Sequence, residues 1–138
     1  MVWDQEDPSP FDRVVGHPEL VQYWENWGRP GDLGVVAEKD GEYIGAAFGR
    51  LFTQDRPSYG FVDEHTPEVG IGIVADERGK GLGRRMMLEL ESLYRDSGSS
   101  KLSLSVNHTN PARHLYESLG YSEVGRDENS AQMVKQLG

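Results

Sequence analysis

The sequence contains no cysteine among its 138 residues. This absence excludes disulfide bonds, thiolate metal sites and a cysteine nucleophile. The chain also lacks an apolar run near the length of about 20 residues that a membrane-spanning helix requires. We therefore expect neither a membrane span nor a bound metal.

Positive charge is also scarce, because 14 lysine and arginine residues stand against 23 aspartate and glutamate residues, which gives a formal net charge of −9. Domains that bind nucleic acid usually carry a basic face, so we expect no nucleic-acid partner. The acidic start of the chain is unlike a signal peptide, which favours a cytoplasmic protein. The length predicts a single domain over residues 1–138, with an irregular segment at about 1–17.

A β-hairpin is predicted near the middle of the first half of the chain. Two apolar runs, residues 35–38 and 43–51, flank Asp40-Gly41, and an Asp-Gly pair between such runs is a strong hairpin signal. The second run contains several small residues, which indicates that another element packs closely against it; these are Gly45, Ala46, Ala47 and Gly49.

The remaining elements follow from periodicity and capping signals. We expect helices at 18–27, from 82 to Gly98 and from Asn110-Pro111 to Gly120, and strands at 69–74, 101–106, 121–124 and 131–137. A long polar loop at 53–66 has a length that is often functional. An early antiparallel pair followed by a strand–helix–strand crossover predicts an α/β (α+β) fold around a mixed sheet.

Residues 68–94 form the stretch around which the chain is organised. A strand of β-branched residues leads into a glycine-rich turn and then into an amphipathic helix; the turn reads Arg78-Gly79-Lys80-Gly81-Leu82-Gly83. Glycines allow a ligand to approach the backbone, and the first N–H groups of a helix have no partner within it. With Arg84 and Arg85 nearby, this arrangement predicts a site for phosphate or pyrophosphate.

Two common phosphate-binding motifs do not fit this turn. The P-loop pattern fails because Val74 lies where its first glycine should be, and Gly81 replaces the serine or threonine that binds magnesium. The dinucleotide fingerprint fails because the glycines at 79, 81 and 83 are spaced by two throughout.

A third pattern fits better, and it is more specific because two separate parts of the sequence match it. The first is Arg78-x-x-Gly81-x-Gly83 after a strand; the second, about thirty residues later, is Asn110-Pro111-Ala112-x-x-x-Tyr116-Glu117-x-x-Gly120-Tyr121. Together they resemble the GNAT-type N-acetyltransferases from about residue 43 to the C-terminus. The resemblance implies an acyl-CoA N-acyltransferase fold with a mixed, mostly antiparallel central sheet, splayed parallel strands and flanking helices.

The resemblance also implies a site for acetyl-CoA, the co-substrate of the family. The pyrophosphate would lie on the glycine turn, and the pantetheine arm would pair with the backbone of the central strand. The implied cofactor-binding residues are Ile73, Val74, Arg78, Gly79, Lys80, Gly81, Leu82, Gly83, Arg84 and Asn110.

Catalytic roles follow in the same way. Tyr116 resembles the tyrosine that protonates the departing thiolate, which suits a phenol that is protonated at neutral pH. Glu68 resembles a glutamate that acts as the base through water, and the backbone N–H at or near Val74 is the oxyanion candidate by resemblance. The acidic loop residues Asp63 and Glu64, next to His65, would attract a cationic amine.

The expected reaction is therefore transfer of an acetyl group from acetyl-CoA to a primary amine by direct attack in a ternary complex. The amine would belong to a small molecule or a peptide, and a homodimer stays open. Two other interpretations also stay open: a non-catalytic acyl-CoA-binding or regulatory module, and a nucleotide-binding domain. The family's usual first strand is either absent here or formed by residues 13–15. Ala75 replaces a proline that family members often have at the end of the central strand.

Overall fold

The computed structural model describes residues 25–55 and 57–138. The irregular segment predicted at 1–17 and the strand considered at 13–15 lie outside the described residues, as does most of the helix predicted at 18–27. The last part of that helix prediction is wrong, because Glu25 and Asn26 form a turn with Asn26 at a φ of 53°.

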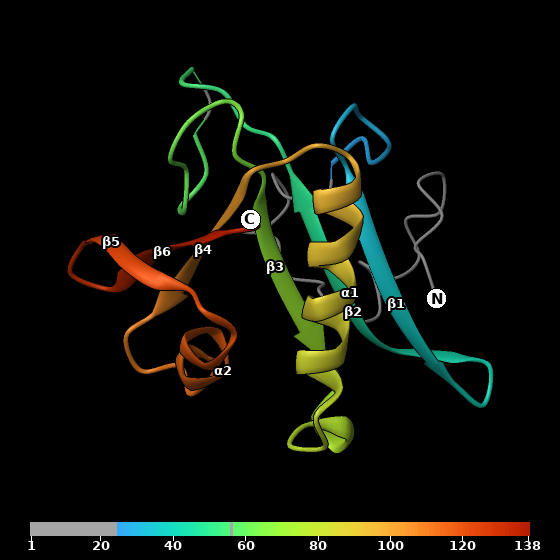
Figure 1. The fold of residues 1–138 in the computed structure, drawn as a ribbon. Coiled ribbons are helices and arrows are strands. Elements are labelled where there is room, and N and C mark those ends of the chain that lie inside the picture. The colour runs from blue at the N-terminus through green and yellow to red at the C-terminus, as the bar shows by residue number, and fades with distance from the viewer. Residues whose placement is uncertain (1–24, 56) are drawn as a thin grey trace.

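One six-stranded sheet runs through the described part of the chain in the order β1-β2-β3-β4-β6-β5 (Figure 1). All neighbouring strands are antiparallel except β3 and β4. The predicted mixed, mostly antiparallel sheet is therefore confirmed. Its strands are β1 (Leu33–Lys39), β2 (Glu42–Arg50), β3 (Glu68–Ile73), β4 (Lys101–Asn107), β5 (Ser122–Arg126) and β6 (Ser130–Gln136).

The first hairpin forms where the Asp-Gly pair predicts it. Asp40 and Gly41 connect β1 to β2 with φ values of 53° and 81°. Two successive positive φ angles are the feature of a type I′ turn, whose twist matches that of the two strands.

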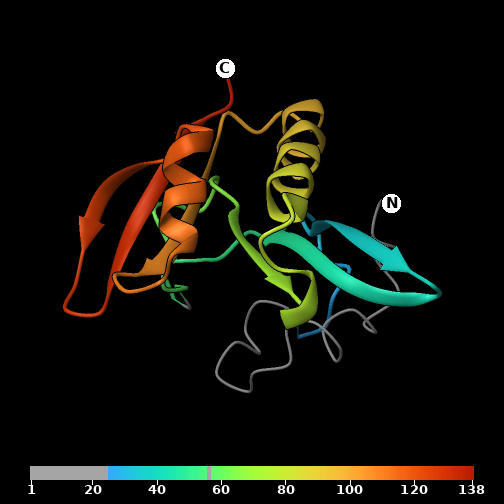
Figure 2. The same cartoon turned by 90° about the horizontal axis from the view of Figure 1, so that it is seen from below.

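The parallel pair β3–β4 is a fork. The two strands pair at one position, where Glu68 lies opposite Ser103. Beside this pair the Ser103 N–H donates to the Pro67 carbonyl oxygen at 3.0 Å. Beyond that point the strands diverge, with β1–β3 on one side and β4–β6 on the other (Figure 2). The splayed strands implied by the family resemblance are thus confirmed.

Within residues 25–55 and 57–138, two helices cover one face of the sheet, and their bounds agree with the predicted segments. Helix α1 (Leu82–Asp96) packs on β1, β2 and β3, whereas α2 (Ala112–Leu119) packs on β4. A short 3₁₀ helix, η3 (Ala75–Glu77), links β3 to the glycine turn. None of the described helices is long and apolar enough to cross a membrane.

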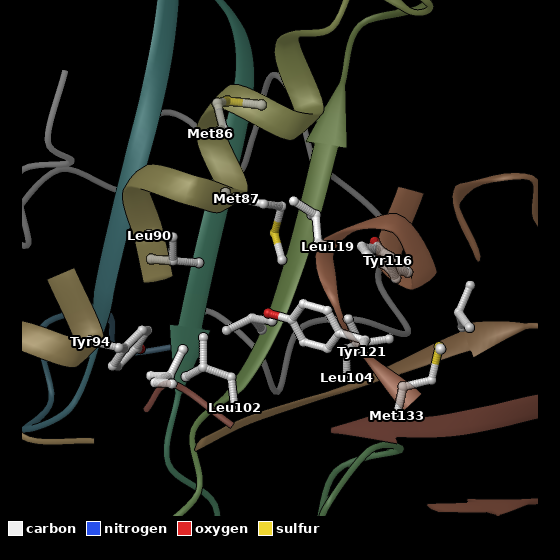
Figure 3. Close-up of a cluster of buried hydrophobic side chains, with 14 of the residues drawn as sticks. Met86, Met87, Leu90, Tyr94, Leu102, Leu104, Tyr116, Leu119, Tyr121 and Met133 are labelled. Atoms are coloured by element: carbon white, nitrogen blue, oxygen red, sulfur yellow. The ribbon is translucent and has the colours of Figure 1, made fainter. Parts of the chain in front are cut away.

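A single apolar cluster fills the space between both helices and the sheet (Figure 3). It joins the two sides of the fork, because α1, β4, α2 and β6 all contribute to it. Its labelled members in the figure are Met86, Met87, Leu90, Tyr94, Leu102, Leu104, Tyr116, Leu119, Tyr121 and Met133. A smaller cluster around Phe48 and Phe52 covers the other face of β1 and β2.

Small residues in β2 leave room for α1, as the sequence predicts. A methyl group placed on Gly45 would approach the Met86 Cε atom to 2.8 Å, and one on Gly49 would overlap the phenol of Tyr94, whose Cε2 atom would lie 2.7 Å away. Tyr94 is 1% exposed and its hydroxyl donates to the Gly31 carbonyl oxygen at 2.8 Å.

These two glycines give the first prediction. Gly49→Ala should lower the free energy of unfolding by about 1–3 kcal/mol, because the buried Tyr94 ring cannot move aside without losing its packing. Gly45→Ala is the matched control and should cost clearly less, since the flexible Met86 side chain can rotate. Urea denaturation of both variants measures the difference, and equal losses would contradict this account of the packing.

Candidate active site

A cavity of about 520 Å³ opens where β3 and β4 separate. Its walls come from both strands of the fork, from α2, from the loop after β2 and from the β5–β6 turn. The lining includes Phe48, Tyr59, Glu68, Ile71, Gly72, Ser105, Asn107, Asn110, Tyr116 and Asn129. The cavity therefore lies at the splay that the family resemblance implies.

The free edge of β3 presents backbone groups to this cavity. The Val74 N–H donates to the Ile44 carbonyl oxygen of the β2 side at 2.9 Å, whereas the Pro67 carbonyl faces β4. Since alternate residues of a strand direct their N–H and C=O groups to opposite neighbours, the amides of Ile71 and Ile73 face the fork. The oxyanion prediction is therefore wrong for Val74 itself, whose N–H is engaged inside the sheet.

The glycine turn has a backbone geometry that favours glycine at two positions. Gly79 and Gly81 have φ values of 78° and 83°, in the left-handed region that favours glycine, and α1 begins directly after them at Leu82. A methyl group on either glycine would meet no atom within 4 Å. The turn is thus open on its outer side, where the amides at the start of α1 have no helical partner.

Gly83 has a different role from the two glycines before it. It is buried, and a methyl group there would lie 3.3 Å from side-chain atoms of Ile71, Ile73 and Leu115. Its small size lets the start of α1 approach both β3 and α2. This function is packing, which the spacing of the glycines in the sequence does not distinguish from ligand contact.

The basic residues near the turn are held in specific places. Arg78 donates from Nε to the Ile73 carbonyl oxygen at 3.0 Å, and Arg84 donates to the Ser118 hydroxyl at 3.1 Å. Lys80 pairs with Glu77 at 3.2 Å. Arg85 lies apart from them, in a second hollow between α1 and β1.

Glu77 makes two ion pairs that the sequence does not predict. Its carboxylate lies between two ammonium groups, with Lys39 Nζ 3.0 Å from Oε1 and Lys80 Nζ 3.2 Å from Oε2. Hydrogen bonds from Lys39 and Lys80 hold the pKa of Glu77 below its usual value. These ion pairs connect the end of β1 to the turn, and both lysine side chains are more than half exposed.

Glu68 is a buried residue of the cavity wall. It is 3% exposed, and its Oε1 atom accepts hydrogen bonds from the Gly60 N–H at 2.9 Å and from the Ser58 hydroxyl. Gly60 lies directly against β4, because a methyl group on it would come within 2.7 Å of the Leu104 carbonyl carbon. The loop after β2 therefore covers Glu68, and the length of this loop is the only signal of it in the sequence.

Tyr116 enters the cavity from α2. It is 6% exposed, and burial raises the pKa of its phenol to about 12. The ring contacts that of Tyr121 edge-on, with centroids 6.0 Å apart. The phenol is therefore a protonated, uncharged group at neutral pH.

Asn110 both caps α2 and lines the cavity. Its side-chain oxygen accepts a hydrogen bond from the Ala112 N–H at 2.9 Å, and Pro111 has a helical φ of −63°. Gly120 ends the helix at a φ of 103°. The predicted N-cap and left-handed terminator are both confirmed, and together they fix the rotation of α2 that brings Tyr116 to the cavity.

The acidic loop residues lie differently from the other candidates. Asp63 pairs with Lys101 at 3.3 Å, and Glu64 accepts a hydrogen bond from the Gln54 N–H at 3.0 Å. Of the described residues that line the cavity, none is Asp63, Glu64 or His65. The structure thus brings Glu68, Asn110 and Tyr116 together in one cavity and leaves this acidic group outside it.

Comparison with known proteins agrees with this geometry. The sequence profile of the acetyltransferase (GNAT) family matches residues 2–121. The chain belongs to this family.

Curated relatives include the L-amino acid N-acyltransferase MnaT of Escherichia coli, which is 31% identical over 112 residues, 80% of this chain and 62% of the relative. Streptothricin acetyltransferase of Streptomyces lavendulae is 29% identical over 119 residues, 83% of this chain and 63% of the relative. The chain thus spans less than two thirds of the length of these relatives.

Solved structures show the same fold. A ribosomal-protein-alanine N-acetyltransferase from Brucella melitensis has 29% identity and a TM-score of 0.65, covering 81% of this chain and 73% of the other. A GCN5-related N-acetyltransferase from Kribbella flavida has 19% identity and a TM-score of 0.73, covering 99% of this chain and 95% of the other.

Proposed function

We propose that the protein is an acetyl-CoA-dependent N-acetyltransferase that acts on a primary amine by direct attack in a ternary complex. The observation that carries this proposal is the fork cavity, which holds Glu68 on one strand and Tyr116 on the helix of the other side. A base and an acid thus face a common space that is bordered by backbone donors. Membership of the acetyltransferase family supports the same reaction.

The site fits acetyl-CoA on structural grounds. The open outer side of the turn at Gly79 and Gly81 suits a pyrophosphate held by backbone N–H groups. The fork-facing amides of β3 suit an extended pantetheine arm. A related structure from Salmonella typhimurium was solved with acetyl-CoA; it is 26% identical and has a TM-score of 0.63, covering 78% of this chain and 66% of the other.

The residues proposed to hold the cofactor are Ile71, Ile73, Arg78, Gly79, Lys80, Gly81, Leu82, Arg84 and Asn110. The prediction that Val74 pairs its backbone with the pantetheine arm is wrong, because its N–H donates to the Ile44 carbonyl oxygen and its own carbonyl oxygen accepts from the Glu77 N–H. Gly83 supports the site by packing the start of α1.

When bound, acetyl-CoA supplies an acetyl group that is activated as a thioester. Glu68 accepts the proton of the attacking amine through water. Tyr116 holds a proton on its hydroxyl for the departing thiolate, and a fork-facing β3 amide donates to the carbonyl oxygen as its charge develops. Asn110 keeps α2 in the orientation that directs Tyr116 to the cavity.

The acceptor is proposed to be a primary amine of a small molecule or a peptide N-terminus. The names of the relatives include acyltransferases of an L-amino acid and of streptothricin. Glu68 lies at the cavity wall and would favour an acceptor that arrives as a cation. The rival interpretation, a non-catalytic acyl-CoA-binding module, would keep the glycine turn and would tolerate the loss of Tyr116.

The turn can be tested by a matched pair of glycine variants. Gly81→Ala should raise the Kd for CoA about tenfold, equivalent to about 1.4 kcal/mol, because its methyl group enters the open space and strains the left-handed backbone. Gly41→Ala carries the same strain at a φ of 81°, against 83° for Gly81, but lies in the β1–β2 turn, so it should leave the Kd unchanged. Isothermal titration calorimetry with CoA measures both, and equal effects would contradict the pyrophosphate site.

The reaction can be tested by acetyl-CoA-dependent thiol release against a library of amines. Tyr116→Phe should lower kcat by about 10²- to 10⁴-fold, the usual contribution of a general acid, while the Kd for acetyl-CoA changes little. Burial raises the pKa of Tyr116 to about 12, so this acid stays protonated as the pH rises and kcat should not decline on its account below about pH 11. Unchanged turnover in Tyr116→Phe across the library would remove Tyr116 as the acid and favour the binding-module interpretation.

The base can be tested by Glu68→Gln, which keeps an acceptor oxygen for Ser58 and Gly60 but cannot take up a proton. We expect kcat/KM at neutral pH to fall by about 10²-fold and to recover partly at higher pH, where more of the amine is already uncharged. Glu64→Gln is the control, since the Glu64 carboxylate bonds to the Gln54 N–H in the same loop. A Glu68→Gln pH profile parallel to that of the wild type would show that another group accepts the proton.

A further inference from the structure

A group of three charged or polar residues, two of them buried, lies behind Tyr116, and the proposed mechanism does not use it. Glu91 of α1 is 1% exposed. Its Oε1 atom pairs with Lys135 Nζ of β6 at 2.7 Å, and its Oε2 atom accepts a hydrogen bond from the Tyr121 hydroxyl at 3.2 Å. We refer to Glu91, Lys135 and Tyr121 as the Glu91 triad.

The Glu91 triad crosses from one side of the fork to the other. Glu91 belongs to the helix that packs on β1–β3, whereas Lys135 lies on β6, and Tyr121 follows α2. In the sheet itself the two sides meet in register only at Glu68 and Ser103. The triad is therefore a directional polar connection in a core that is otherwise apolar, and each of its bonds requires a particular spacing of the two sides.

Tyr121 connects this triad to Tyr116. The two rings meet edge to face, with an interplanar angle of 65° and centroids 6.0 Å apart (Figure 3). The Tyr121 N–H also donates to the Tyr116 carbonyl oxygen at 3.0 Å. Because Tyr121 is held at its hydroxyl by Glu91, its ring has a fixed position against which the Tyr116 ring packs.

Tyr121 is suited to a permanent donor role. Burial of the phenol and, to a smaller extent, the negative charge of Glu91 raise the pKa of Tyr121 far above its usual value. The hydroxyl therefore keeps its proton through the pH range of an assay, and its hydrogen bond to Glu91 persists. Lys135 balances the buried Glu91 charge, which would be costly without a partner.

We propose that Tyr121, held by Glu91 and Lys135, is a positioning residue that sets where the Tyr116 hydroxyl lies in the fork cavity. This inference rests on the proposed function, in which Tyr116 is the acid. A misplacement of a reacting group by about 1 Å can cost 10²-fold in rate. The pyrophosphate turn and the β3 amides lie on other elements, so a displaced Tyr116 would change turnover more than cofactor binding.

The test is a double-mutant cycle of Tyr116→Phe and Tyr121→Phe, measured by acetyl-CoA-dependent thiol release. Tyr121→Phe should lower kcat about tenfold while the KM for acetyl-CoA stays within about twofold. In the double variant kcat should equal that of Tyr116→Phe alone, because a residue that acts only through Tyr116 has no further effect once the Tyr116 hydroxyl is gone. Tyr94→Phe is the matched control. Tyr94 lies on α1, and its buried hydroxyl donates to the Gly31 carbonyl oxygen at 2.8 Å. Its loss should leave kcat unchanged.

Distinct results separate this inference from the proposed function. If Tyr116→Phe alone leaves kcat unchanged, the acid role is wrong and the positioning role is wrong with it. If Tyr116→Phe is slow but the losses of the two variants multiply in the double variant, the acid role stands and the positioning role is overturned. An equal loss of kcat in Tyr94→Phe, or a rise in KM with constant kcat in Tyr121→Phe, would also overturn it.

Discussion

The parallel pairing of β3 with β4 at Glu68 and Ser103 is the constraint on which the rest of the site depends. Were the two strands paired along their whole length, the amides of Ile71 and Ile73 would be used within the sheet. Because the strands separate, these half-buried residues direct their amides to the fork instead of to a neighbouring strand. In the proposed function they pair with an extended ligand that offers acceptors at the spacing of a strand.

A fork of this kind weakens the sheet and must be stabilised elsewhere. The apolar cluster between the helices and the sheet does this, because it takes side chains from both sides of the fork. Apolar contacts are non-directional, however, and allow small sliding movements. The 2.7 Å ion pair of the buried Glu91 with the partly exposed Lys135 adds a directional contact between the same two sides.

Local features of the fold could be predicted from the sequence, because short segments determine them. Asp40-Gly41 specifies the hairpin, the glycines at 79 and 81 specify the left-handed turn, and Asn110-Pro111 specifies the start of α2. In each case the backbone angle or hydrogen bond that the residue type favours is the one that the structure contains. The family was indicated by the two parts of the motif together, the first from Arg78 to Gly83 and the second from Asn110 to Tyr121.

Features that depend on distant contacts could not be predicted. The direction of the Val74 N–H depends on the register with β2, which places it against Ile44. The burial of Glu68 depends on a loop that returns Ser58 and Gly60 to it. In the sequence Gly83 resembles the two ligand-facing glycines before it. The side chains of Ile71, Ile73 and Leu115 that surround it show that its small size serves packing.

The proposed base and the proposed acid lie on opposite faces of the sheet. Val69 points into the cluster beneath the helices, so its neighbour Glu68 lies on the opposite face, because successive residues of a strand alternate. Tyr116 belongs to the cluster on the helical face. Both line the cavity, which therefore reaches from one face to the other through the fork. In the proposed reaction the amine would approach from the face of Glu68, and the thiolate would depart on the face of Tyr116. The two proton transfers are then separated by the thickness of the sheet, and their relative placement depends on how the two sides of the fork are held together.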